Sequence, residues 1–181
     1  VNLGSILEKK NKSVEAKNYL KKAIELNSNF LKSYSILASI NINEGKLKEA
    51  EKLLLRCIEI NPNLAESHLN LGCLLKELGK IEEAEISLRK SLEIKPNNDL
   101  ALTNLAVVIL ELGKANEAEK LLHKAVSINP NSSIAFNSLG NIYSNKKILD
   151  LAEESYRKAI KLQPNFASVS YTHLTLPTKV T

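Results

Sequence analysis

The chain has 181 residues, of which 44% are apolar, and its formal net charge at pH 7 is +5. It holds no apolar run long enough to cross a bilayer, so we expect neither a membrane span nor a membrane partner. Its two cysteines, Cys57 and Cys73, match no paired metal-ligand or redox spacing, and we predict that both are reduced packing residues.

The first thirty residues hold most of one helix pair. Leu3 and Gly4 stand at positions whose residue types return later in the chain, and Asn11 occupies a slot where the chain turns. Asparagine tolerates the left-handed backbone that often follows a helix. We therefore predict a partial first repeat over residues 1–30, in which Ser28 replaces the proline of the later repeats.

Four full units follow this first one. The stretches "IEINPN", "LEIKPN", "VSINPN" and "IKLQPN" place Pro62, Pro96, Pro130 and Pro164 at intervals of 34 residues. Proline stops a helix because it lacks an N–H group and clashes with the preceding turn. The spacing predicts repeats over residues 31–64, 65–98, 99–132 and 133–166, and a non-repeat tail over residues 167–181.

Each unit is predicted to form two helices. The first helix carries a stripe of apolar or aromatic residues with one small residue at helical spacing: Tyr34, Leu37, Ala38; His68, Leu71, Gly72, Leu75; Leu102, Leu105, Ala106, Ile109; Phe136, Leu139, Gly140, Tyr143. The second helix carries one apolar face: Ala50, Leu54, Cys57, Ile58; Ala84, Leu88, Ser91, Leu92; Ala118, Leu122, Ala125, Val126; Ala152, Tyr156, Ala159, Ile160. Gly45, Gly79 and Gly113 separate the two helices, whereas Lys147 fills that slot in the last unit, where we expect a different turn.

The small residues inside the helices indicate how the units pack. Glycine inside a helix costs roughly 1 kcal/mol relative to alanine, so Gly4, Gly72 and Gly140 predict close approach of a second helix. A two-helix unit of this size does not bury its stripe alone, so neighbouring units must stack. The sequence predicts an all-α fold of stacked antiparallel helix pairs, an α-solenoid with a 34-residue period.

These features resemble the tetratricopeptide repeat. The resemblance rests on the interval, the Leu-Gly or Leu-Ala pairs, the second-helix alanines and the closing prolines, and it covers residues 1–166. The chain departs from the family at its usual tryptophan, which is replaced by Tyr34, His68, Leu102 and Phe136. The resemblance implies a right-handed superhelix whose first helices line a concave groove that holds an extended peptide or a helix of a partner, and it does not imply catalysis.

Helical phase places particular side chains toward that groove. The candidate peptide-binding residues are Ser35, Ser39, Asn43, Asn70, Cys73, Glu77, Thr103, Asn104, Val107, Glu111, Asn137 and Asn141. The same phase adds Ile42, Leu100 and Ile134 to the wider set of groove positions. Charges in this wider set are few, namely Lys32, Lys76, Glu66, Glu77 and Glu111. Phosphate binding needs concentrated lysine and arginine, so we exclude nucleic acid as a partner of the groove.

Asparagines recur at one groove position. Asn2, Asn70 and Asn104 occupy equivalent places, which Ile36 and Ser138 interrupt. The series is similar to the asparagine ladder with which the superhelix of O-linked N-acetylglucosamine transferases binds a peptide backbone. An amide offers both a donor and an acceptor to an extended main chain. The alternative is that these asparagines are ordinary polar residues of a helix surface, and the sequence leaves both readings open.

Residue types that serve catalysis or metal binding form no constellation. His68, His123 and His173 are far apart in the repeat register, and His68 stands where an aromatic side chain packs, so we expect structural roles. No glycine-rich phosphate loop and no paired nucleophile occur. We predict no catalytic residues, no metal ligands and no cofactor.

The last residues break the repeat. "VSYTHLTLPT" (169–178) begins where a sixth unit should start, and its β-branched residues and Pro177 disfavour a helix. This decapeptide resembles a translated transposase adapter used in DNA sequencing, so we exclude it from the fold and expect the natural protein to continue beyond about Ser168. Without a following repeat, Tyr156, Ala159 and Ile160 are expected to lack cover, which predicts fraying or self-association through the last repeat.

The sequence leads to one functional prediction and one alternative. We predict a non-enzymatic scaffold that binds an extended protein segment along its concave face. The alternative is the substrate-recruiting arm of a larger enzyme, such as a glycosyltransferase or another group-transfer enzyme, whose catalytic domain lies outside these residues. Abundant lysine, asparagine and isoleucine suit an AT-rich bacterial genome, and a cytoplasmic location is the default expectation.

Overall fold

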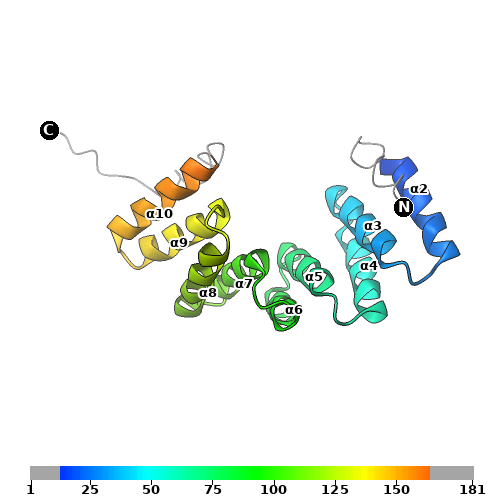
Figure 1. Cartoon of the computed structure of the whole chain (residues 1–181), viewed down its shortest axis with the longest axis horizontal. Coiled ribbons are helices and arrows are strands. Elements are labelled where there is room, and N and C mark those ends of the chain that lie inside the picture. The colour runs from blue at the N-terminus through cyan, green and yellow to red at the C-terminus, as the bar shows by residue number, and fades with distance from the viewer. Residues whose placement is uncertain (1–12, 164–181) are drawn as a thin grey trace. The chain divides into compact units, whose positions relative to one another are not determined.

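The structure is a computed structural model that describes residues 13–163 (Figure 1). Within these residues the chain forms only α-helices: α2 (Ser13–Leu26), α3 (Leu31–Asn43), α4 (Leu47–Ile60), α5 (Ala65–Glu77), α6 (Ile81–Ile94), α7 (Asp99–Glu111), α8 (Ala115–Ile128), α9 (Ser133–Asn145) and α10 (Leu149–Leu162). The chain divides into two compact units between Pro96 and Asn97. We call them the N-unit, which contains α2 to α6, and the C-unit, which contains α7 to α10.

Consecutive helices pack in pairs inside each unit. α3 packs on α4 and α5 on α6 in the N-unit, while α7 packs on α8 and α9 on α10 in the C-unit. Further contacts join α2 to α3, α4 to α5, and α8 to α9. The first helices of the pairs begin at Leu31, Ala65, Asp99 and Ser133, which confirms the all-α fold and the 34-residue helix-pair period. The right-handed superhelical path stays a prediction, as do the tail at 167–181 and the first helix of the partial repeat, which lie outside the described residues.

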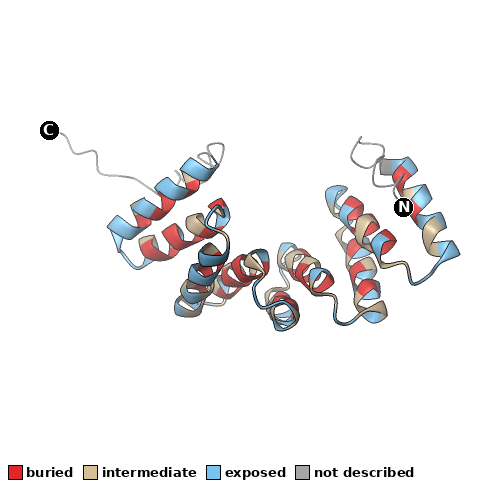
Figure 2. Ribbon diagram, viewed as in Figure 1, coloured by how far each residue is buried: buried red, intermediate tan, exposed pale blue. Residues whose placement is uncertain are grey.

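The core of each pair lies between its two helices, where the apolar stripes meet (Figure 2). In the α5–α6 pair the side chains of Leu71, Leu75, Ala84 and Leu88 are all buried. Burying one leucine side chain stabilises the folded chain by roughly 1.5–3 kcal/mol, so these stripes supply most of the drive for pairing. The stripes predicted from the sequence are therefore the packing faces of the helices.

Two glycines mark the closest approach within their pairs. A Cβ atom built on Gly72 would lie 2.6 Å from Cγ of Leu88 on α6, and one built on Gly140 would lie 2.6 Å from Cε1 of Tyr156 on α10. The equivalent positions Ala38 and Ala106 already carry a Cβ atom. These four small residues allow the second helix to lie directly against the backbone of the first.

The turns inside the pairs share one backbone conformation. Gly45, Gly79 and Gly113 have φ values of 73°, 74° and 76°, and Lys147 has φ 60°. The residue after each of them donates its N–H to a carbonyl five residues earlier, as Ile148 does to Tyr143 at 2.9 Å. The expectation that the turn at Lys147 differs is therefore wrong. This lysine takes the left-handed conformation at a cost of roughly 1–2 kcal/mol relative to glycine because the same hydrogen bond closes the helix end.

The last helix pair covers more of its own apolar surface than predicted. Tyr156 and Ala159 are 6% and 1% exposed, because Tyr156 lies over Gly140 of α9. The expectation that these two residues lack cover is therefore wrong. Apolar side chains of this pair that do remain exposed include Ile148, Leu149 and Leu151 at the start of α10, Leu162 at its end and Ile134 on α9. Self-association through this repeat stays a prediction.

The contact between Gly140 and Tyr156 gives a test of the packing. We expect Gly140→Ala to lower the free energy of unfolding by about 1–3 kcal/mol, because the rigid ring of Tyr156 leaves no room for a methyl group. In a Tyr156→Leu background the same change should be neutral or stabilising. Alanine then faces leucine, as Ala106 faces Leu122 at the equivalent positions, and gains roughly 1 kcal/mol of helix propensity.

Urea unfolding of the four chains (Gly140→Ala, Tyr156→Leu, the double variant and the unchanged protein), followed by circular dichroism, measures this coupling. An equal loss of stability on Gly140→Ala in both backgrounds would show that the ring does not limit the approach of the two helices.

Candidate functional site

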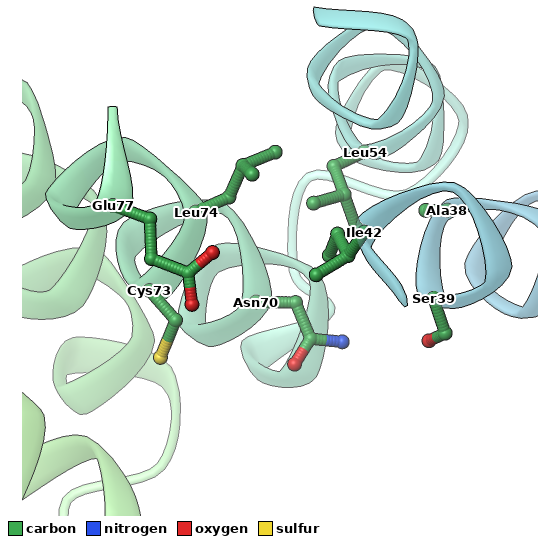
Figure 3. A pocket seen from close by; sticks show the side chains of 8 residues that line it. All are labelled: Ala38, Ser39, Ile42, Leu54, Asn70, Cys73, Leu74 and Glu77. Atoms are coloured by element: carbon green, nitrogen blue, oxygen red, sulfur yellow. The ribbon is translucent and has the colours of Figure 1, made fainter. Parts of the chain in front are cut away.

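The candidate groove residues of the N-unit stand on the first helices α3 and α5. Ser39, Asn43 and Glu77 are exposed, whereas Asn70 and Cys73 are partly exposed. On α5, residues 70, 73 and 77 are three and four positions apart, so they share one face of the helix. Figure 3 shows Asn70, Cys73 and Glu77 in a row along α5, with the Asn70 amide extending toward Ser39 of α3.

A hollow of about 150 Å³ lies between these side chains. We call it the groove hollow; it is lined by Ala38, Ser39, Ile42, Leu54, Asn70, Cys73, Leu74 and Glu77 (Figure 3). Leu54 and Leu74 are 1% exposed and belong to the core. The rim carries one hydroxyl, one amide, one thiol and one carboxylate. The groove hollow therefore combines an apolar floor with separate polar groups, the combination that holds a peptide side chain beside a hydrogen-bonded main chain.

Three of its residues were not among the sequence candidates because they belong to the packing faces of the helices. Ala38 is the small stripe residue of α3, Leu54 comes from the second helix α4, and Leu74 is a core residue of α5. They line the groove hollow only because three helices meet there. The periodicity of a single helix carries no signal for this.

The two cysteines differ in access and neither is prepared as a nucleophile. Cys57 is buried at 0% exposure, and Cys73 is partly exposed in the groove hollow. Burial raises the pKa of both thiols above the ordinary value of 9.0. Both thiols are free, as predicted, and Cys57 is a packing residue of the core, whereas Cys73 lines the groove hollow.

Not every sequence candidate offers a free polar group. Thr103 is 4% exposed and its hydroxyl donates a hydrogen bond to the Asp99 carbonyl at 2.8 Å, so we leave it out of the candidate site. The Ser35 hydroxyl lies 3.6 Å from the sulfur of Cys57 on α4, and so it points toward its own pair. Both residues occupy the same place in their repeats. In these two repeats that position faces the helix pair more than the groove, whereas Asn137 at the same place is partly exposed.

The C-unit presents a separate set of groove candidates on α7 and α9. Glu111 and Asn141 are exposed, and Asn104, Val107 and Asn137 are partly exposed. The Asn104 amide donates to the Leu100 carbonyl of its own helix at 2.9 Å, and the Asn141 side-chain oxygen accepts from the Tyr156 hydroxyl at 2.7 Å. Leu100 and Ile134 add apolar surface here, being 54% and 48% exposed.

The two described histidines have hydrogen-bond partners, whereas His173 lies outside the described residues. Nε2 of His68 lies 2.8 Å from the carbonyl oxygen of Pro62. Tyr34 occupies the same position in the preceding repeat, and its hydroxyl donates a hydrogen bond to the Ser28 carbonyl at 3.0 Å. His68 therefore ties the helix to the preceding loop, which agrees with the structural role predicted for it. Nε2 of His123 lies 2.9 Å from the Tyr143 hydroxyl. Across residues 13–163, the structure brings together no three His, Cys, Asp or Glu side chains that could hold a metal ion.

Family profiles described as the tetratricopeptide repeat match most of the chain. One profile matches residues 1–30, 31–64 and 65–98, a second matches residues 87–120, and a third matches residues 133–166. No curated protein sequence matches the chain.

No described helix is both long enough and apolar enough to serve as a membrane span.

Solved structures of helical repeat proteins share the fold. The crystal structure of MamA superposes with a TM-score of 0.79 at 21% sequence identity, over 93% of this chain and 98% of that one. YrrB, a TPR protein with an unusual peptide-binding site, gives a TM-score of 0.73 at 23% identity over 92% of this chain and 86% of that one. PilF of Pseudomonas aeruginosa gives a TM-score of 0.80 at 20% sequence identity, over 93% of this chain and 81% of that one. At these identities the likeness concerns the fold.

Thiol labelling tests the geometry of the groove hollow. We expect maleimide to modify Cys73 at pH 8 more slowly than it modifies a free cysteine peptide, because its raised pKa leaves less thiolate. Cys57 should react only after unfolding, because it is not exposed. Mass spectrometry of the digested protein distinguishes the two sites. Equal modification of both cysteines in the folded chain would contradict the packing of α4 against α3.

Proposed function

The chain belongs to the tetratricopeptide repeat family, and from this premise we propose that it is a scaffold that binds an extended peptide segment along the exposed face of its first helices. The groove hollow of the N-unit is the observation that carries the proposal. It joins an apolar floor to Ser39, Asn70 and Glu77 at its rim. A peptide side chain fits the floor while the amide of Asn70 pairs with the main chain.

The size and chemistry of the groove hollow limit the ligand. A space of about 150 Å³ accommodates one side chain of moderate size rather than a whole small molecule. Glu77 on the rim favours a neighbouring positive charge or a free main-chain N–H group, since a carboxylate is an acceptor only. The ligand class is therefore a peptide segment with an apolar residue that is flanked by a basic or neutral one.

The asparagines play unequal parts in this proposal. Asn70 lies at the hollow, with its amide directed across the space between α5 and α3 (Figure 3). The Asn104 amide donates one N–H to the Leu100 carbonyl of its own helix. Its oxygen and its second N–H can bond to a ligand. Within the proposed site Asn70 is the main anchor of a peptide backbone. Asn104 is a separate candidate contact on the C-unit.

A peptide-display selection on the full chain tests the function. We expect selected peptides to lose affinity by about tenfold on Asn70→Ala, because one backbone anchor is worth roughly 1–1.5 kcal/mol. Ser39→Phe should abolish binding by filling the hollow. Both variants should keep the helicity of the unchanged protein.

Asn18→Ala is the matched control, since it removes an exposed amide from the second helix α2. The control should bind with unchanged affinity. Peptides whose affinity is insensitive to Asn70→Ala and to Ser39→Phe would place the binding surface elsewhere and refute this proposal.

A further inference from the structure

A second hollow lies in the N-unit on the other side of α3. It has a volume of about 500 Å³ and is formed by α2, α3 and α4; its lining residues are Lys17, Lys21, Leu37, Asn41, Lys46, Glu49, Lys52 and Leu53. We call it the basic hollow, since four lysines and one glutamate line it. Asn41 is two residues from Ser39, about 200° around the helix, so the basic hollow and the groove hollow face opposite ways.

The next repeat shows that the charge is specific to this place. A hollow of about 280 Å³ occupies the same position one repeat later, between α4, α5 and α6. Adding 34 to each residue number gives the equivalent residue of the next repeat. Glu51 stands in place of Lys17, Leu55 in place of Lys21, Leu75 in place of Asn41 and Ile86 in place of Lys52. This lining holds four apolar side chains, Ser87 and the carboxylates of Glu51 and Glu83, and it holds no lysine. We call it the lysine-free hollow. The same backbone framework therefore carries four lysines in one repeat and none in the next.

Asn41 is unusual for its position. It is 8% exposed, and the other units place the large side chains of Leu75, Ile109 and Tyr143 there, all of them buried. An amide at a core position forfeits the free energy of burying an apolar side chain, roughly 1.5–3 kcal/mol for a leucine. An amide that lines the basic hollow can donate to an oxygen anion and accept from an N–H group.

The edge of the basic hollow already shows what its lysines bind. Lys17 and Lys46 both form ion pairs with the carboxylate of Glu44, the latter at 2.8 Å. The two ammonium groups lower the pKa of Glu44 to about 2. Lys21 and Lys52, both exposed, face the same space from α2 and α4. Two of the four lysines are thus occupied by one carboxylate, and the other two extend the positive rim.

We propose that the basic hollow is a second docking site, which binds an acidic peptide segment of a partner protein. Carboxylates of the segment pair with Lys21 and Lys52, and one accepts a hydrogen bond from the Asn41 amide. An apolar side chain between them rests on Leu37 and Leu53. The apolar floor and the volume favour a peptide over a bare phosphate group, while the rim charge favours glutamate and aspartate over neutral residues. This site is independent of the proposed groove.

The test uses the full chain and a fluorescein-labelled peptide with glutamates around a central leucine, followed by anisotropy. The affinity should fall by about tenfold in Lys21→Glu/Lys52→Glu, and it should weaken as salt is added. Glu44→Gln should raise the affinity severalfold, because it releases Lys17 and Lys46 from their internal carboxylate. Asn41→Leu should weaken binding by about fivefold without lowering the melting temperature, because leucine is the residue of the next repeat.

Three controls make the result decisive. Lys95→Glu/Lys120→Glu changes net charge equally at exposed sites elsewhere and should leave the affinity unchanged. The same peptide with glutamine in place of glutamate should not bind. A single-stranded oligonucleotide should bind no better to the unchanged protein than to Lys21→Glu/Lys52→Glu.

Three results would overturn the proposal. One is an equal loss of peptide affinity in both lysine pairs, which would indicate net charge alone. Another is an affinity for the acidic peptide that does not change in Lys21→Glu/Lys52→Glu. The third is an oligonucleotide that depends on these two lysines while the acidic peptide does not, which would make the ligand a nucleic acid.

Discussion

The contact between one small residue of the first helix and one large side chain of the second closes each described helix pair. Gly72 faces Leu88 and Gly140 faces Tyr156 so closely that a methyl group on either glycine would overlap its partner. Where the pair instead has alanine, as at Ala106, the side chain is completely buried. Because the backbone of one helix meets a side chain of the other, the apolar stripes of both helices are buried at this contact. The side chains outside the stripes differ from repeat to repeat.

This division explains how one framework presents different chemistry on its two sides. On α3, Ser39 faces the groove hollow and Asn41 faces the basic hollow, while the stripe between them holds the pair together. Changes at the positions outside the stripes leave the packing intact, as the basic hollow and the lysine-free hollow of neighbouring repeats show. The repeat therefore sets where the two hollows lie, and the individual side chains set the charge of their linings.

The helix pairs and their packing faces were predictable because they depend on local periodicity and on residue size. The glycine turns and the close approach at Gly72 followed from the same rules. Three features were not predictable because they depend on local hydrogen bonds or on contacts between helices that the apolar periodicity does not report. Thr103 turns its hydroxyl back to its own helix, Lys147 accepts a left-handed backbone to close a helix end, and Tyr156 finds cover on Gly140. The hollows likewise need three helices at once, so no single stripe reveals them.

If the small-to-large contact closes each pair, both helices of a pair must open together. Native-state hydrogen exchange on the α5–α6 pair measures this most directly, since it gives an opening free energy for each buried amide. We predict that the central amides of α5 and α6 open with the same free energy, within about 0.5 kcal/mol. An α6 that opens at much lower free energy while α5 stays protected would contradict it, because the second helix would then be an appendage and not half of the folding unit.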